Sequence, residues 1–133
     1  MNKERYELLQ KYIELEMSPL LLSNTSSNEF EGAIILKSNI DQSELNGHYE
    51  GINFMPPTWY QKLIEKSQSN YTILLIENIN EIANEEQKKF IEILKYKKIS
   101  TFNLPKNCLI IVTCSDLNNK KINEEVYSLL IQI

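Results

Sequence analysis

The most constraining feature of the sequence is the uninterrupted aliphatic run from Ile73 to Ile76, which ends in two polar residues, Glu77 and Asn78. Such a run is typical of a strand buried on both faces, as in the parallel sheet of an α/β domain. A second apolar run, from Cys108 to Thr113, predicts another strand of the same kind. Because ligands of open α/β sheets bind at the carboxyl ends of the strands, Glu77 and Asn78 mark the first place to look for chemistry.

The remaining pattern predicts a three-layer α/β sandwich, in which residues 1–133 form one domain around a mostly parallel five-stranded sheet. Strands are expected at residues 19–22, 33–37, 73–76, 108–113 and 129–133, with a short edge strand at 99–104. Helices are expected at 2–16, 57–67 and 85–96, with a turn of helix near 123–127. Asn84 is a predicted helix N-cap, because Gln87 follows three residues later as in a capping box. Residues 38–55 are expected to form a long polar loop.

Composition and charge narrow the classes of function. With 42% apolar and 24% charged residues, the chain of 133 residues has an ordinary globular composition. The net charge of −4 and the single arginine, Arg5, argue against direct binding of nucleic acid or a membrane surface, which requires clustered basic side chains. No secretory leader pattern and no apolar run of about twenty residues is present, so we expect a cytoplasmic protein.

Several residues that can carry chemistry have structural interpretations here. Cys108 and Cys114 fall on one face of a predicted strand about 20 Å apart, too far for a disulfide, and are expected to be small buried hydrophobic residues. His48 has no partner with zinc-ligand spacing, so no metal site is expected. Trp59 and Tyr60, at the start of a predicted helix, are expected to be core and anchor residues rather than stacking platforms for a ligand.

From Ala33 to Ile133 the order of these features resembles the core of the AAA+ ATPases, and within them the MoxR-like branch. The likeness rests on the strand at 33–37, the segments Asp41 to Gly47 and Pro56 to Leu63, the run 73–78, Asn80 to Gln87, Asn103 to Pro105, and the run 109–117. The resemblance implies a P-loop NTPase-like topology. It further implies that the strands lie in the spatial order terminal, first, fourth, third, second.

The run that ends in Glu77 and Asn78 resembles a Walker B strand, in which an aspartate holds Mg²⁺ and a glutamate orients the attacking water. Here Glu77 occupies the metal-binding position, and its side chain is one methylene longer than that of aspartate. Asn78 occupies the position of the glutamate, and its neutral amide cannot accept the proton of the water. The family's sensor asparagine falls on Ser115. We therefore expect Glu77, Asn78 and Ser115 to be remnants of a nucleotide site, with no catalytic residue and no metal ligand, unless Mg²⁺ binds at Glu77. The alternative is a purely structural role, in which Glu77 and Asn78 are the end of a strand and its turn. Ser115 and Asp116 would then cap the turn that follows their strand.

Other parts of an active ATPase are also missing. The segment from Ser23 to Phe30 has neither the glycines nor the lysine of a phosphate-binding loop. About ten residues separate the first two strands, fewer than a helical crossover needs, so the phosphate-loop helix is expected to be deleted. No arginine lies near the terminal strand, and the helical lid is expected to be absent as well.

These departures predict a nucleotide-inert AAA+-like interaction or regulatory module without a cofactor. Its expected partners are a second copy or an active AAA+ ATPase, since neighbouring subunits of this family contact one another around the nucleotide site. An alternative is an ATP-binding AAA+ ATPase with an unorthodox site, in which Glu77 holds Mg²⁺ and Lys37 replaces the missing lysine. Another alternative is a clamp-loader-like subunit of DNA replication.

Loss of a helix from one face of a sheet uncovers aliphatic side chains, and a patch of a few hundred Å² is worth several kcal/mol of association at ~25 cal/mol per Å². The residues expected to be uncovered are Leu20, Leu22, Ile34 and Leu36. Alternatively, the helix at 2–16 folds over the gap and makes a self-sufficient monomer.

Overall fold

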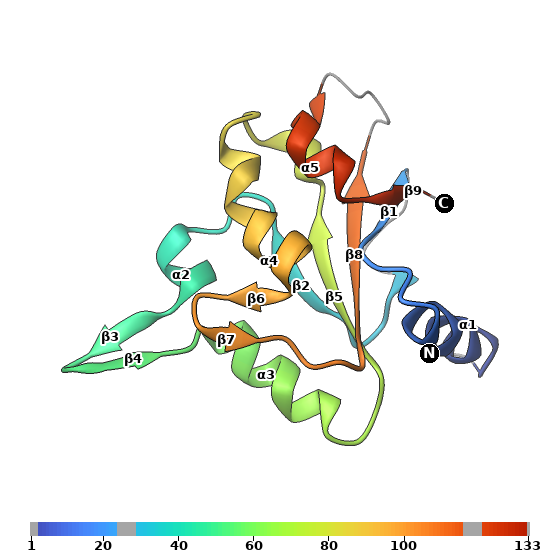
Figure 1. Ribbon diagram of the computed structural model, residues 1–133, viewed down its shortest axis with the longest axis horizontal. Helices are drawn as coiled ribbons and strands as arrows, with labels where there is room; N and C mark the ends of the chain where they lie inside the picture. Colours follow the sequence, from blue (N-terminus) through green and yellow to red (C-terminus); the bar gives the residue numbers. More distant parts are fainter. Residues whose placement is uncertain (1–2, 24–28, 116–120, 133) are drawn as a thin grey trace.

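The computed structural model, which describes residues 3–23, 29–115 and 121–132, has an α/β fold around a five-stranded sheet (Figure 1). Its strands, in spatial order, are β2 (Ile34–Lys37), β5 (Thr72–Glu77), β8 (Cys108–Cys114), β1 (Leu20–Ser23) and β9 (Ile131–Gln132). Every pair of neighbouring strands is parallel. Counted along the chain, these are the second, third, fourth, first and terminal strands, which is the spatial order that we expected.

The two long apolar runs form the centre of this sheet. Ile73 pairs in register with Leu109, and Leu75 pairs with Ile111. The aliphatic side chains of both strands are buried, whichever face of the sheet they point to. The prediction of two neighbouring, fully buried parallel strands is therefore confirmed.

Helices and two small hairpins surround the sheet. The helices are α1 (Lys3–Glu14), α2 (Gln42–Asn46), α3 (Thr58–Ser67), α4 (Ile91–Tyr96) and α5 (Glu124–Ser128), with the 3₁₀ turns η2 (Ile79–Glu81) and η3 (Glu86–Phe90). The hairpins pair β3 (His48–Glu50) with β4 (Asn53–Met55), and β6 (Lys98–Ile99) with β7 (Phe102–Asn103). Between β1 and β2, the described residues 29–33 contain no α-helix, and residues 24–28 lie outside the described part.

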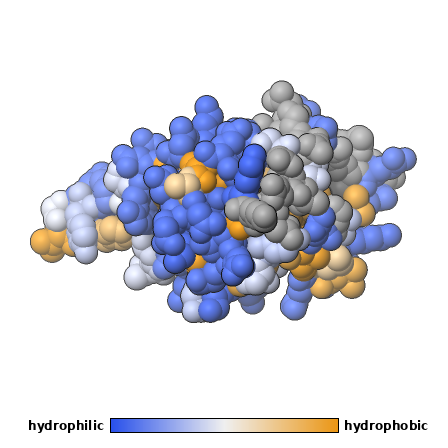
Figure 2. Space-filling view, turned by 90° about the horizontal axis from the view of Figure 1, so that it is seen from above, coloured by the Kyte–Doolittle hydropathy of each residue, from blue (hydrophilic) through white to orange (hydrophobic). Residues whose placement is uncertain are grey.

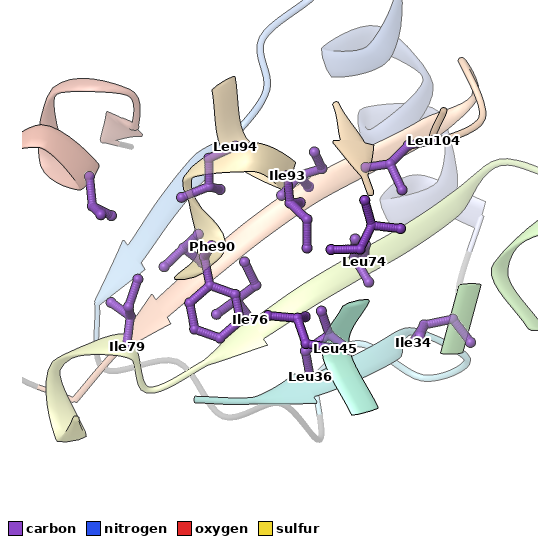
Figure 3. Packing of buried hydrophobic residues seen from close by; sticks show 14 of the residues in the cluster. Ile34, Leu36, Leu45, Leu74, Ile76, Ile79, Phe90, Ile93, Leu94 and Leu104 are labelled. Atoms are coloured by element: carbon purple, nitrogen blue, oxygen red, sulfur yellow. The ribbon is translucent and has the colours of Figure 1, made fainter. Parts of the chain in front are cut away.

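The two faces of the sheet carry helical layers of unequal size. On one face, α2, α3, η3, α4 and α5 enclose the larger core, in which Phe90 packs among aliphatic side chains of the sheet such as Leu36 and Ile76 (Figure 3). On the other face, Tyr12, Ile13 and Met17 from α1 and the turn after it pack on a smaller cluster. The predicted three-layer arrangement is thus present, with one of its layers formed by α1.

The predicted exposed patch is wrong for most of its members. Ile34 and Leu36 are buried because they point to the larger core, and Leu20 is buried on the face that α1 covers; Leu22 is half-buried. Ile35 points the other way from its neighbours and is 41% exposed. The alternative, in which the amino-terminal helix packs over this face, describes the structure, although the side chains of Tyr6 and Leu9 lie outside the described part.

The segment at 85–96 differs from the single capped helix that we predicted. It divides into η3 and α4, and Asn84 is not the N-cap, because Glu85 precedes η3 and no side chain caps it. Gln87, expected to complete a capping box, is fully buried. The side chain of Gln87 points inward, where it binds backbone groups of other segments.

Residues 38–55 and 99–104 are also more ordered than predicted. The expected loop contains α2 and the β3–β4 hairpin, and the expected edge strand is the β6–β7 hairpin. Both hairpins turn through a residue with positive φ, Gly51 at 63° and Ser100 at 55°. Strands of two or three residues are too short to leave an alternating pattern, so periodicity could not reveal them.

Candidate functional site

The carboxyl edge of the sheet brings together the three residues predicted to be remnants of a nucleotide site. Glu77 ends β5, Asn78 follows it, Ser115 follows β8, and these two strands are neighbours. Glu77 is half-buried and lies in register with Lys37 at the end of β2. The lysine that could replace a phosphate-loop lysine therefore ends the strand next to Glu77.

Asn78 contributes to this edge through its backbone. Its φ of 52° and ψ of 56° place it in the left-handed region, where asparagine is tolerated better than most residues. Its N–H donates to Oγ1 of Thr113 at 3.0 Å, and Thr113 is fully buried in β8. This bond ties the end of β5 to its neighbouring strand.

Ser115 binds a residue that the sequence analysis did not single out as part of the site. Its N–H donates to Oδ1 of Asn80 at 3.1 Å, and its Oγ accepts from Nδ2 of Asn80 at 3.0 Å. The signal available in the sequence for this residue was the presence of a second asparagine, Asn80, two residues beyond Asn78. Asp116, expected to act with Ser115 as a cap, lies outside the described residues.

A second polar cluster joins η3 to α5. The side-chain amide of Gln87 donates to the carbonyl oxygens of Ile82 and Lys121 at 3.2 and 2.7 Å, and its Oε1 accepts from the N–H of Asn123 at 2.7 Å. Asn123 also donates through Nδ2 to Oδ1 of Asn84 at 2.8 Å and caps α5. These bonds explain why the side chain of Gln87 is buried, and they give the cluster a structural role.

The two aromatic residues at the start of α3 are held inside the protein, as predicted. Trp59 is 8% exposed and donates through Nε1 to the carbonyl oxygen of Leu45 at 3.0 Å. Tyr60 is half-buried, and its hydroxyl donates to the carbonyl oxygen of Asn103 at 2.6 Å. Burial also raises the pKa of the Tyr60 hydroxyl. Both side chains anchor segments that surround the sheet.

The other potentially reactive groups are His48 and the two cysteines, of which Cys114 ends β8 directly before Ser115. Among the described residues, no group of three His, Cys, Asp or Glu side chains could hold a metal ion. His48 is exposed and contacts Glu50 at 3.3 Å. No disulfide joins Cys108 and Cys114, and burial raises the pKa of the Cys108 thiol to about 11, so this thiol is protonated at neutral pH.

Across the part of the chain that the structure describes, no helix has the length and apolar character that crossing a membrane requires.

Comparisons with known proteins find likeness in structure but not in sequence. The sequence matches no protein-family profile, and no curated protein matches it significantly. Among solved structures, NtrX from Brucella abortus is similar over 96% of this chain, with a TM-score of 0.55 and 13% sequence identity. The chain spans 35% of the length of that structure. At this identity the likeness concerns the fold alone.

Proposed function

We propose that this protein is a nucleotide-inert, AAA+-like interaction module. The observation that carries the proposal is the pairing of polar groups with one another at the carboxyl edge of the sheet. Asn80 and Ser115 form two mutual hydrogen bonds, and Asn78 is tied to Thr113 through its backbone. A ligand that used these groups would first have to break the bonds between them, and each bond is worth about 1 kcal/mol.

Two further observations support the AAA+-like part of the proposal. The spatial order of the strands is the one that the resemblance implies, and a domain-sized part of NtrX has a similar fold.

The connection between Ser23 and Ile34 contains ten residues, with no lysine and with Gly32 as its single glycine. A phosphate cradle built from a glycine-rich loop and a lysine has no counterpart in this segment.

The projecting β3–β4 hairpin supports an interaction role. It extends away from the sheet (Figure 1), and hydrophobic colour reaches its far left end in Figure 2. Tyr49 and Ile52 of this hairpin are 72% and 95% exposed. Large apolar side chains gathered on a projecting element are typical of surfaces that contact other proteins. The partners that we propose are an active AAA+ ATPase or a second copy of this chain.

Titration calorimetry with ATP and Mg²⁺ tests the inert character. We expect no saturable heat at micromolar protein concentration, because the groups that would hold the β and γ phosphates are lacking. Light scattering at the same concentration distinguishes a second copy from a different partner. A saturable heat of binding in the micromolar range would overturn the inert proposal.

The second candidate function, an ATP-binding protein with an unorthodox site, is favoured by the neighbouring positions of Lys37 and Glu77. If ATP binds, Glu77→Ala should abolish the Mg²⁺-dependent heat, whereas Glu81→Ala should leave it unchanged. Glu81 is a suitable control because it is an exposed carboxylate in η2, a few residues further along the chain. Equal losses in both variants would argue against a metal site at Glu77.

A further inference from the structure

The outer edge of β2 is open. β2 is the last strand at one end of the sheet and pairs with β5 alone, so no described strand lies on its other side. An edge strand presents backbone N–H and C=O groups that can pair with another chain. Ile35, which points away from the larger core, is 41% exposed on this strand.

A groove of about 760 Å³ follows this edge, and residues 33–36 line it consecutively. Successive side chains of a strand point to opposite faces, so four residues in a row can line one groove only where the groove runs along the backbone edge. The opposite wall is α3, through Thr58, Trp59, Lys62 and Lys66. The groove therefore offers strand backbone on one side and a helix face on the other.

The two walls have matching lengths and opposite directions. The four residues of β2 span about 13 Å, and the eight-residue step from Thr58 to Lys66 along α3 spans about 12 Å. Nζ of Lys66 donates to the carbonyl oxygen of Gly32 at 2.9 Å, just before β2 begins. The end of α3 thus lies at the start of β2, and the groove accommodates an extended segment of about four residues.

The charge of the groove differs in sign from that of the whole chain. Lys62 and Lys66 line the α3 wall, and the exposed Lys37 ends β2, whereas Glu44 is the single carboxylate among the lining residues. The chain as a whole has a net charge of −4. Pairing of two β2 edges would bring the same lysines of two copies together, which argues against a second copy as the occupant.

We propose that the outer edge of β2 binds an extended acidic segment of a partner protein as an additional strand. Backbone hydrogen bonds to β2 hold the segment, and its carboxylates alternate toward Lys62 and Lys66 while its apolar side chains lie beside Ile35. This inference rests on the interaction role proposed above and names a second surface for it, in addition to the β3–β4 hairpin.

The test uses a fluorescein-labelled, acetylated peptide of about six alternating glutamate and valine residues, long enough to cover the β2 edge. Fluorescence anisotropy should show saturable binding to the intact protein, and Lys62→Glu should weaken it about tenfold, because the variant turns an attraction into a repulsion. Lys95→Glu, the same change at an exposed position of α4, is the matched control and should bind the peptide as the unaltered protein does. Circular dichroism establishes that both variants are folded.

A second arm requires no protein variant. The same peptide with every backbone amide N-methylated cannot donate strand hydrogen bonds, so it should fail to bind. Amide NMR shifts caused by the unmodified peptide should concentrate at residues 33–37 and 58–66. The proposal would be overturned if the peptide did not bind saturably, or if Lys95→Glu weakened binding as much as Lys62→Glu. It would also be overturned if the N-methylated peptide bound undiminished, or if the protein formed a dimer through β2. None of these outcomes depends on the ATP titration, so the two proposals fail separately.

Discussion

The β3–β4 and β6–β7 hairpins are both short and antiparallel, yet one projects from the domain and the other is part of it. Ile99 of β6 is fully buried. At the turn, the N–H of Ser100 donates to the Glu92 carboxylate at 2.7 Å, and its Oγ donates to the Asn46 carbonyl oxygen at 2.8 Å. In contrast, all three residues of β3 are exposed, and Ile52, in the turn between β3 and β4, is 95% exposed.

The two hairpins meet at an aromatic contact. The ring of Phe54 in β4 stacks on that of Phe102 in β7, with centroids 6.0 Å apart, and Tyr49 packs edge-on against Phe54 at 4.9 Å. A hairpin alone is marginally stable in water, so the projecting one depends on its base for its shape. The comparison teaches that sequence changes at its tip should have little effect on the fold.

The largest effect is expected from Ile99→Ala in the packed hairpin. This change should lower the free energy of unfolding by roughly 2–5 kcal/mol, because it leaves a cavity in the larger core. Urea denaturation followed by circular dichroism measures the loss. A loss below about 1 kcal/mol would mean that the core collapses around the smaller side chain and that the packed hairpin is not an integral part of it.

Gly47→Ala tests whether the base of the projecting hairpin is fixed. A Cβ atom at Gly47 would lie 2.4 Å from the carbonyl oxygen of Met55, and its φ of 100° disfavours any residue other than glycine. We expect a loss of about 2 kcal/mol in urea denaturation.

Gly51→Ala is the matched control for that substitution. Gly51 also has a positive φ, of 63°, but nothing lies within 4 Å of its added Cβ, so about 1 kcal/mol should be lost. Equal losses at Gly47 and Gly51 would show that backbone strain alone is responsible.

A smaller effect is expected where α3 holds the packed hairpin. Tyr60→Phe removes the hydrogen bond to the carbonyl oxygen of Asn103 and should cost about 1 kcal/mol of unfolding free energy. Tyr127→Phe removes a longer bond, of 3.0 Å, to the side-chain Oε1 of Gln132, and should cost less. The reverse ranking would contradict the anchoring role of Tyr60.

The smallest effect is expected from Ile52→Ala, the same substitution as in the packed hairpin. Because Ile52 is 95% exposed, the free energy of unfolding should change by less than about 0.5 kcal/mol. A loss comparable to that of Ile99→Ala would show that the tip contacts the domain in solution, and the contrast between the two hairpins would then be wrong.

The sequence predicted the central sheet well because β5 and β8 are long aliphatic runs, and a strand buried on both faces needs such a run. It failed at both hairpins, whose strands are too short for a periodic pattern, and at Gln87, whose role depends on Asn123 far along the chain. At the carboxyl edge, Glu77, Asn78 and Ser115 lie at the ends of neighbouring strands, and their role as remnants of a nucleotide site stays a prediction. Asn80 was missed although it follows Asn78 by two residues, because its hydrogen-bond partner Ser115 lies 35 residues further along the chain.

The strand order also determines how late during synthesis of the chain β1 can pair with its neighbours. β1 pairs with β8 and β9, and 84 residues lie between Ser23 at the end of β1 and Cys108 at the start of β8. At about 5–20 residues per second, the ribosome needs roughly 4–17 s to make that stretch. During this interval Leu20 and Leu21, almost fully buried in the finished protein, have no strand to pair with. The nascent chain therefore carries an unpaired aliphatic strand until most of the domain has been translated.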